Sequence, residues 1–265
     1  MRKKSLLVGL LVAATAVLSA TPAGAIVGGK KADENYPFMA SLQHPVMPWK
    51  PNHYCGGAVI APAWVLTAAH CVDSVGEAEM PIEEFAVRVG SNRTDSGGEV
   101  AKAKRVVVHP DYRPAGPGEG NDIALVELAE PVSVRPVALP ARTPGPGTPA
   151  RAIGWGRTCA KDTEKNCLTP PRELKQLEET VVAGKTCARL STAGAELCVQ
   201  TPEKAGAICF ADSGSPLIGK VDGRWTVLGS ADRFGTSNGR DDCDDSTALY
   251  ADVSAHLSWI ARYVR

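Results

Sequence analysis

The sequence predicts an all-β protein that ends in a helix. Short apolar or alternating runs follow one another along the chain, and clusters of Gly, Pro, Asn and Asp separate them, as expected for strands joined by turns. Segments with a helical period are scarce except at the C-terminus. With 265 residues, of which 44% are hydrophobic, the chain can bury a substantial core, either as one large all-β unit or as two domains.

Nine segments have the pattern of strands. They are FMASLQ at 38–43, GGAVIAPAWVLTAAH at 56–70, FAVRVG at 85–90, AKRVVVHP at 103–110, DIALVEL at 122–128, ARAIGWG at 150–156, ICF at 208–210, SPLIGK at 215–220 and WTVLGS at 225–230. The last segment, VSAHLSWIARYVR, has the period of a helix. One face of that helix would carry Val253, Leu257, Ile260 and Val264.

The organisation of the chain follows from composition. Residues 1–25 have a basic head, an apolar stretch too short for a membrane anchor and small residues before Ile26, which is typical of an export signal. The stretch RPVALPARTPGPGTPAR at 135–151 is rich in Pro and Gly and predicts a boundary between two similar parts. We therefore expect a secreted protein with a first domain at 26–135 and a second at 136–265.

Charge and cysteine content narrow the class of protein. Removing the signal takes 3 bases and no acid from a chain with 29 of each, so the mature chain has a formal charge of about −3. No basic patch favours nucleic acid. The 8 cysteines are an even number in an exported chain, without a tight CxxC pair, so disulfides are favoured over zinc. Their spacing alone leaves the connectivity open.

Ser213, in CFADSGSPL at 209–217, is a candidate nucleophile, although the stretch also suits an ordinary polar turn. A serine needs a base to take its proton and a third group to orient that base. His70 closes an apolar run beside Cys71, and Asp122 heads another apolar run where a buried carboxylate needs a partner. The other histidines are expected to be solvated or structural, and they are His44, His53, His109 and His256.

Taken together, TAAHC, NDIALVEL and DSGSP, in the order His, Asp, Ser, resemble the chymotrypsin and trypsin family of secreted serine endopeptidases. The segments IVGGKKADENYPFMASLQ, CGGAVIAPAWVLTAAHC, AIGWG and LYADVSAHLSWI are similar to that family as well. An α/β-hydrolase is disfavoured because the serine lacks a G-x-S-x-G elbow. The resemblance implies two six-stranded antiparallel β-barrels with a C-terminal helix, and an active site in the cleft between the barrels.

The resemblance also implies roles for individual residues. Ser213 would be the nucleophile, His70 the general base and Asp122 its orienting group, while the backbone N–H groups of Ala211 and Ser213 would form the oxyanion hole. Ala211 stands where the family usually has glycine. No metal or cofactor is implied. The expected partners are protein or peptide substrates and protein protease inhibitors, and the expected state is a monomer without nucleic acid or membrane.

Further expectations from the resemblance concern disulfides and activation. The implied pairs are Cys55–Cys71, Cys187–Cys198 and Cys209–Cys243, which leaves Cys159 and Cys167 to pair locally. A new N-terminal ammonium at Ile26 would pair with Asp212 inside the protein. Either removal of the signal directly before Ile26 activates the enzyme, or cleavage at Ala20 or Ala23 leaves a short activation peptide.

Specificity depends on the pocket beside Ser213. Ala207 stands where a trypsin carries an aspartate, so cleavage after Lys or Arg is not expected. An apolar pocket for small or medium side chains would be lined by Ala207, Ile208, Phe210 and Ala248. Its mouth is occupied either by Phe234 or by Gly235, and in both registers Asp232 or Arg233 can disturb Asp122. We expect an active endopeptidase; the alternative is a weak or silent homologue that acts as a binding module, favoured by Ala211 and the altered segment SADRFG.

Overall fold

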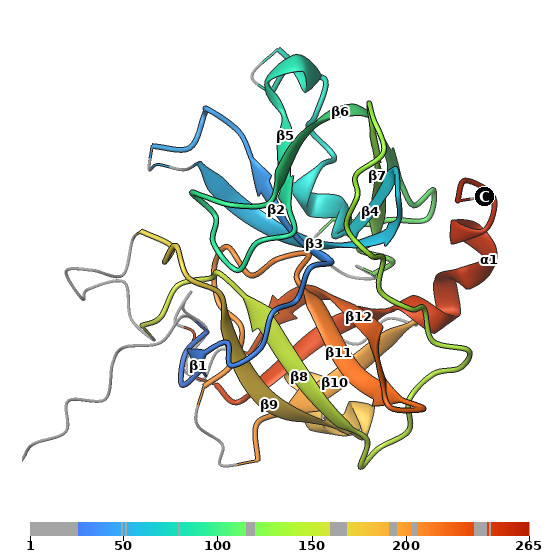
Figure 1. The fold of residues 1–265 in the computed structure, drawn as a ribbon. Coiled ribbons are helices and arrows are strands. Elements are labelled where there is room, and N and C mark those ends of the chain that lie inside the picture. The colour runs from blue at the N-terminus through green and yellow to red at the C-terminus, as the bar shows by residue number, and fades with distance from the viewer. Residues whose placement is uncertain are drawn as a thin grey trace, which may run out of the picture.

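The computed structural model describes residues 26–48, 50, 52–78, 80–114, 120–159, 169–190, 195–202, 206–235, 243 and 245–264 (Figure 1). The predicted export signal at 1–25 lies outside these residues. The strands are β1 (Lys30–Lys31), β2 (Met39–Gln43), β3 (His53–Ala61), β4 (Trp64–Thr67), β5 (Ala86–Val89), β6 (Glu99–Val108), β7 (Ala124–Leu128), β8 (Pro149–Gly154), β9 (Lys175–Val182), β10 (Glu196–Gln200), β11 (Pro216–Val221), β12 (Arg224–Phe234) and β13 (Thr247–Asp252). The helices are η1 (Ala69–Cys71), η2 (Ile82–Glu84), η3 (Gly184–Leu190), η4 (Val253–His256) and α1 (Leu257–Ile260), of which only α1 is an α-helix.

The first barrel is closed by six antiparallel strands in the order β2-β3-β4-β7-β6-β5. The predicted run at 56–70 supplies two of these strands, because Pro62 cannot donate to a sheet ladder and the chain turns there between Ala61 and Trp64. The last two residues of that run, Ala69 and His70, lie in the short helix η1 and not in a strand. The barrel interior is filled by the apolar side chains of all six strands.

The second barrel is built from β8 to β13 in the order β9-β10-β13-β12-β11-β8, and a further pairing between β8 and β9 closes it. The short strand β1 adds to the outside of β9. Figure 1 shows the two barrels one above the other, with the first barrel in blue to green and the second in yellow to red. The predicted class, two six-stranded antiparallel barrels, is therefore confirmed.

Two groups of strands differ from the sequence prediction. The segment at 208–210 is not a strand; it enters a tight turn in which the N–H of Asp212 donates to the carbonyl oxygen of Cys209 at 2.9 Å. Conversely, the apolar pattern does not identify β9 and β10. In β9 the polar side chains of Gln176 and Glu179 are buried, which breaks the expected alternation.

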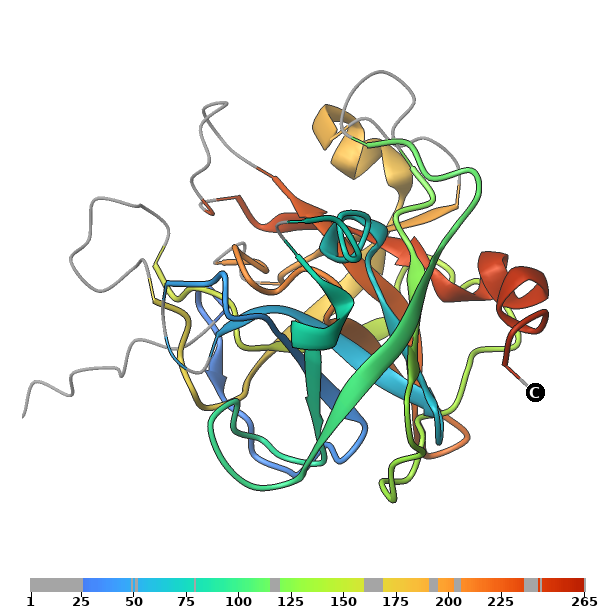
Figure 2. The same ribbon diagram turned by 90° about the horizontal axis from the view of Figure 1, so that it is seen from above.

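The C-terminal helix is short and belongs to the surface of the first barrel. The chain forms η4 and then α1, and Trp259 and Ile260 are buried in the apolar core of the first barrel. The aromatic ring of Trp64, on β4, lies 6.5 Å from the ring of Tyr263. Figure 2 shows this helix at the edge of the molecule, away from β1. No helix among the described residues combines the length and the apolar composition that crossing a bilayer requires.

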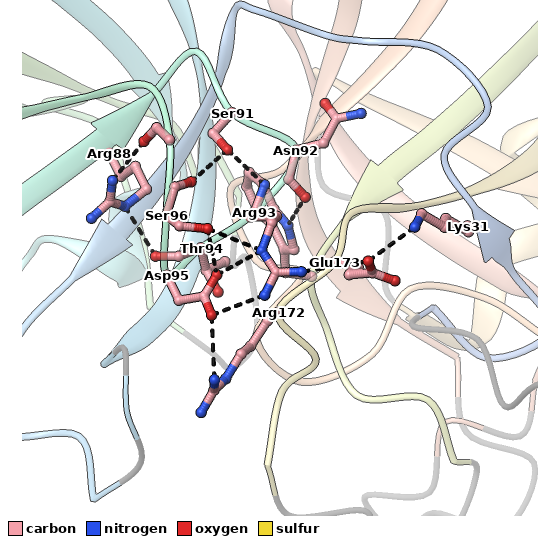
Figure 3. Close-up of polar contacts among 12 residues, drawn as sticks. Lys31, Arg88, Ser91, Asn92, Arg93, Thr94, Asp95, Ser96, Arg172 and Glu173 are labelled. Atoms are coloured by element: carbon pink, nitrogen blue, oxygen red, sulfur yellow. Dashed lines mark hydrogen bonds and ion pairs between the residues drawn. The ribbon is translucent and has the colours of Figure 1, made fainter.

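A polar loop after β5 also joins the two barrels (Figure 3). The guanidinium of Arg93 donates to Asp95 at 2.9 Å and lies 3.5 Å from Glu173, and Arg172 donates to the same Asp95 carboxylate at 3.3 Å. Lys31, on β1, lies 2.9 Å from the same carboxylate oxygen of Glu173. Backbone hydrogen bonds join the same two segments. The loop and the segment before β9 therefore form one cross-linked surface between the barrels.

Candidate active site

The most direct contact between predicted catalytic residues joins His70 and Asp122. His70 lies in η1, after β4, and Asp122 lies just before β7. One oxygen of the Asp122 carboxylate accepts a hydrogen bond from the backbone N–H of His70 at 2.9 Å, and the other lies 2.5 Å from His70 Nδ1. Since a carboxylate can only accept, Nδ1 carries the proton and Nε2 is left as the basic nitrogen.

The neighbouring elements explain why these two residues meet. The antiparallel pairing of Thr67, at the end of β4, with Ala124, at the start of β7, brings the segments that flank these strands together. Asn121, next to Asp122, has a φ of 52°, in the left-handed region that Asn tolerates. Its side-chain oxygen lies 3.1 Å from Nε2 of the buried His256. The C-terminal segment thus supports the loop that carries Asp122, which gives His256 the structural role expected of it.

The pKa values of the pair are shifted in opposite directions. Burial acts to lower the pKa of His70, but the hydrogen bond and the negative charge of Asp122 outweigh it, and the pKa of His70 is raised above its ordinary 6.5. Burial acts to raise the pKa of Asp122, but contacts with His70 outweigh it, and the pKa of Asp122 is lowered. The pair therefore favours a charged imidazolium beside an ionised carboxylate, the arrangement that a general base needs after it takes a proton.

Ser213 comes to the same place from the second barrel. Its carbonyl oxygen accepts a hydrogen bond from the N–H of Gly56, on β3, at 2.8 Å. At Gly214, whose φ is 73°, a Cβ atom would lie 2.2 Å from Thr67 Oγ1, so only glycine lets the two barrels approach this closely. Ser213 and His70 line one cavity of about 470 Å³. Among the described residues no hydrogen bond joins these two side chains, a contact that is often long without substrate.

Ala211 has a left-handed backbone, with a φ of 72°. It is the third residue of the turn from Cys209 to Asp212, the place where a type II turn takes glycine. The carbonyl oxygen of Ala211 accepts a hydrogen bond from Nε2 of His53 at 3.1 Å. The turn and this hydrogen bond fix the peptide after Ala211, and the alanine keeps the conformation at a steric cost.

His53 is a buried support for this turn. Its Nδ1 lies 2.9 Å from the hydroxyl of Ser41, and its ring packs edge-on against Trp155 with a centroid distance of 5.5 Å. Burial lowers the pKa of His53 to about 4, although the hydrogen bond to Ala211 acts in the other direction. His53 is therefore neutral at ordinary pH and structural, in agreement with the sequence expectation.

Asp212 is fully buried next to Ser213. Its carboxylate accepts hydrogen bonds from the N–H groups of Gly156 at 2.7 Å and Cys209 at 2.9 Å. A Cβ atom at Gly154 or Gly156 would lie 2.1 Å from this carboxylate, so both glycines make room for it. Burial raises the pKa of Asp212 to about 7, against the effect of the two hydrogen bonds. Ile26, its predicted partner, is buried in the core of the second barrel, but its nitrogen is still part of a peptide bond.

Disulfides stabilise the site on both sides. The three pairs implied by the resemblance are formed: Cys55–Cys71, Cys187–Cys198 and Cys209–Cys243. The first links β3 to η1 beside His70. Of the pair predicted for Cys159 and Cys167, Cys159 is described and is disulfide-bonded, while Cys167 lies outside the described residues, so the pairing stays a prediction. In the described part of the chain, Cys55, His70 and Cys71 are the one group whose spacing would suit a metal ion, and the disulfide uses both sulfur atoms.

Two aromatic rings close one end of the cavity beside Ser213. The rings of Phe210 and Phe234 meet edge to face with a centroid distance of 5.3 Å, and the guanidinium of Arg157 lies 4.7 Å from the centre of the Phe210 ring. Because Phe234 pairs with Ala248 in the sheet, the register places Phe234 at the cavity wall. Of the two candidates for the mouth of the pocket, Phe234 lines this cavity and Gly235 does not.

The predicted base of the pocket lies behind these rings. Ala207, Ile208 and Ala248 are all buried, with exposures of 1%, 2% and 0%, and none of them lines the cavity beside Ser213. Ile208 and Ala248 pack in the apolar core of the second barrel. The three residues are thus buried and do not open into this cavity, which Phe210 and Phe234 line, and their place in a substrate pocket stays a prediction.

Two further buried carboxyl groups lie near the site, and the sequence pointed to only one of them. Glu179, on β9, lies inside the second barrel near Asp212 and Tyr250, and burial raises its pKa to about 8. Asp232, on β12, lies against Asp122. The altered segment SADRFG pointed to Asp232 or Arg233 as a disturbance near Asp122, and the structure places Asp232 there. No local signal identifies Glu179, because a Glu in an alternating strand normally faces solvent.

Comparison with known proteins agrees with this geometry. The family model described as "Trypsin" matches residues 26–260. The chain belongs to the trypsin family of serine proteases. It is also similar to a trypsin of Sarcophaga bullata, with 34% identity over 204 residues that cover 74% of each chain. Membership of the trypsin family makes this protein a serine-type endopeptidase, whose substrates are proteins or peptides.

Proposed function

We propose that this trypsin-family protein is a secreted endopeptidase in which Ser213, His70 and Asp122 form the catalytic triad. The observation that carries the proposal is the double contact of Asp122 with His70, at 2.9 and 2.5 Å, on a cavity that Ser213 also lines. The three disulfides support an oxidising location outside the cytoplasm.

The chemistry proposed for the triad is acyl transfer. His70 Nε2 takes the hydroxyl proton as Ser213 attacks the carbonyl carbon of the substrate, and a tetrahedral oxyanion forms. The N–H groups of Ala211 and Ser213 stabilise this oxyanion. His70 then gives the proton to the leaving amine, and water hydrolyses the acyl-enzyme by the same steps. Asp122 keeps the imidazole in the required tautomer throughout.

The proposed specificity is for small or medium apolar residues, and not for Lys or Arg, on the acyl side of the cleaved bond. Ala207 supports the second part, because it offers no carboxylate to a basic side chain. The contact between Phe210 and Phe234 favours the small end of the range, because a large side chain would have to separate the two rings.

Activation is proposed to follow cleavage before Ile26. The new ammonium would lie near Asp212, for whose buried carboxylate the described residues show no cationic partner. The burial of Ile26 beside the second-barrel core supports this placement. Sequencing of the N-terminus of secreted protein tests it: Ile26 is the expected first residue, and a start at Thr21 or Gly24 would instead indicate a short activation peptide.

A fluorophosphonate probe tests the catalytic proposal. We expect mature protein to gain the mass of one probe on Ser213 and the Ser213→Ala variant to gain none. An unlabelled Ser213 in correctly folded protein would favour the binding-module alternative, for which the left-handed Ala211 is the specific observation. Digestion of a mixed peptide library tests the specificity, and predominant cleavage after Lys or Arg would contradict it.

A further inference from the structure

Asp232 is placed beside the catalytic pair by an irregularity in β12. Along the pairing of β12 with β13, Ala231 lies opposite Tyr250 and Arg233 lies opposite Leu249, the residue directly before Tyr250 in the sequence. Asp232 is therefore an extra residue without a partner on β13, which is a β-bulge. Bulges turn a side chain away from the normal alternation and are common next to active sites. Here the bulge lets the side chain of Asp232 reach Asp122.

The two carboxyl groups are buried together. The side chains of Asp122 and Asp232 are each 6% exposed, line the same cavity and lie within hydrogen-bonding reach of each other. Two ionised carboxylates have only acceptors and would repel each other. A hydrogen bond between them requires that one of the two groups is protonated.

The surrounding charges decide which group keeps the proton. Asp122 is held in its ionised form by the two hydrogen bonds from His70. Asp232 has the guanidinium of Arg233 at 2.6 Å, but the same guanidinium also lies 2.7 Å from the buried carboxylate of Glu196. Arg233 is thus shared between two acids, so its charge acts on Asp232 and on Glu196 at the same time.

The remaining polar groups around Asp232 lie in one small cavity. This cavity, of about 240 Å³, is lined by His70, Tyr112, Arg113, Gly120, Asp122, Asp232 and Arg233. Burial is the largest influence on Asp232, followed by the charge of Asp122, and together they raise the pKa of Asp232 to about 9 against the opposing charge of Arg233. At neutral pH the carboxyl of Asp232 is therefore a neutral hydrogen-bond donor.

We propose that Asp232 is a positioning residue for the catalytic pair: its protonated carboxyl donates a hydrogen bond to Asp122, and ionisation of Asp232 replaces this support by repulsion. The proposal rests on the proposed function, in that Asp122 must orient His70 during catalysis. It adds a second carboxyl group to the triad, held in place by Arg233, which Glu196 also binds. Full activity would then require a proton on the carboxyl group of Asp232.

The expected consequence is an alkaline loss of kcat. Below the pKa of Asp232 the donor is present, and Asp122 is fixed from His70 on one side and from Asp232 on the other. Above it, two negative charges lie next to each other and the Asp122 carboxylate is displaced or reoriented. Loss of one hydrogen bond to a charged group corresponds to roughly a ten- to hundredfold decrease in rate, which is well below the loss of about 10⁴-fold seen when the triad aspartate itself is replaced by Asn.

Three variants of the mature enzyme test the proposal through the pH dependence of kcat. Asp232→Ala removes the donor, and we expect kcat at neutral pH to fall roughly ten- to hundredfold. Asp232→Asn supplies an N–H donor that does not ionise, so it should restore most of that loss and remove the alkaline decrease caused by Asp232. Glu196→Gln removes a neighbouring negative charge, so the decrease should shift to lower pH.

A second measurement does not require activity. The proton on His70 Nδ1, held against Asp122 at 2.5 Å, should give a separate low-field NMR signal. In the unchanged protein we expect this signal to shift between about pH 8 and pH 10 as the Asp232 proton is lost, and in Asp232→Asn it should stay constant. Deprotonation of the Ile26 ammonium, the other alkaline event, would affect both proteins equally.

The experiments distinguish a failure of the Asp232 proposal from a failure of the proposed function. A signal that shifts equally in both proteins, or does not shift at all, overturns the proposal, as does an Asp232→Ala enzyme with unchanged kcat. If the Asn variant does not fold, Asp232→Ser takes its place, because a serine hydroxyl is a smaller donor that does not ionise in this range. The pH dependence of the His70 signal in the unchanged protein can still be measured. Failure of Ser213 to react with the fluorophosphonate would overturn the proposed function alone, because the NMR titration does not depend on it.

Discussion

Replacement of Ala211 by glycine should stabilise the protein. Ala211 has a φ of 72° at the third position of a turn closed by a 2.9 Å hydrogen bond. A non-glycine residue in this region costs about 1–2 kcal/mol. The greater freedom of glycine in the unfolded chain offsets about 0.4–1 kcal/mol of the gain. The free energy of unfolding should therefore increase by about 0.5–1 kcal/mol in Ala211→Gly, which corresponds to a rise in Tm of roughly 1–4 °C for a chain of this size.

The stability assay compares variants that cannot digest themselves. Urea unfolding of Ser213→Ala, with and without Ala211→Gly, gives the difference in unfolding free energy. Ala101→Gly, on β6 in ordinary strand conformation, is the matched control, and it should lose about 0.5–1 kcal/mol. In the active enzyme, Ala211→Gly should have kcat/KM at least equal to that of the parent, since the relaxed turn keeps the N–H of residue 211.

Two results would refute this reasoning. The first is an Ala211→Gly variant that is less stable than its parent by as much as the Ala101→Gly control, because the left-handed backbone would then carry no steric cost. The second is a fall in kcat/KM, which would mean that the methyl group of Ala211 helps to place the oxyanion donor. Ala211→Val should be strongly destabilised, since β-branched residues rarely adopt this conformation.

Three further predictions concern Phe234, Glu179 and His53. Phe234→Gly should open the pocket and extend cleavage to larger apolar residues, measured on the mixed peptide library; an unchanged preference would argue against Phe234 as the barrier. Glu179 keeps its proton up to about pH 8 in the folded chain and only up to about pH 4.5 in the unfolded chain. The free energy of unfolding should therefore fall as pH rises from 4.5 to 8, and Glu179→Gln should remove this decrease in urea unfolding. His53 binds a proton below about pH 4 when folded and below 6.5 when unfolded, so stability should fall as pH drops through that window; urea unfolding of His53→Gln at several pH values should show a flatter profile.

The sequence pattern predicts the first barrel better than the second. The segments that became β2 to β7 alternate or are continuously apolar, so periodicity identifies them. In β9 the buried positions include Gln176 and Glu179, which no hydrophobic pattern can assign to a core. The segment at 208–210 has the composition of a strand, but the turn that follows at Asp212 uses its backbone hydrogen bonds. The closed barrels themselves were expected only through the resemblance to a known family.

The candidate site was predictable at some positions and not at others. Motifs point to His70, Asp122 and Ser213 as the candidate triad, because the family resemblance is carried by these residue types and their immediate neighbours. The position of Phe234 depends on the bulge at Asp232, which shifts the register by one residue. The hydrophobic pattern of the sequence does not indicate this bulge. The acidic pair of Asp122 and Asp232 also joins residues far apart in sequence, so only the fold brings it together.

The short strand β1 determines how fast the proposed activation can follow cleavage. Lys30 and Lys31 pair with Gln176 and Lys175 of β9, so the chain is anchored four residues after Ile26. An ammonium created at Ile26 is then a tethered ligand, and its local concentration near the second barrel is on the order of millimolar or above. Activation would proceed at the same rate in dilute and concentrated protein. A free peptide with the same first residues would have to reach that local concentration to compete.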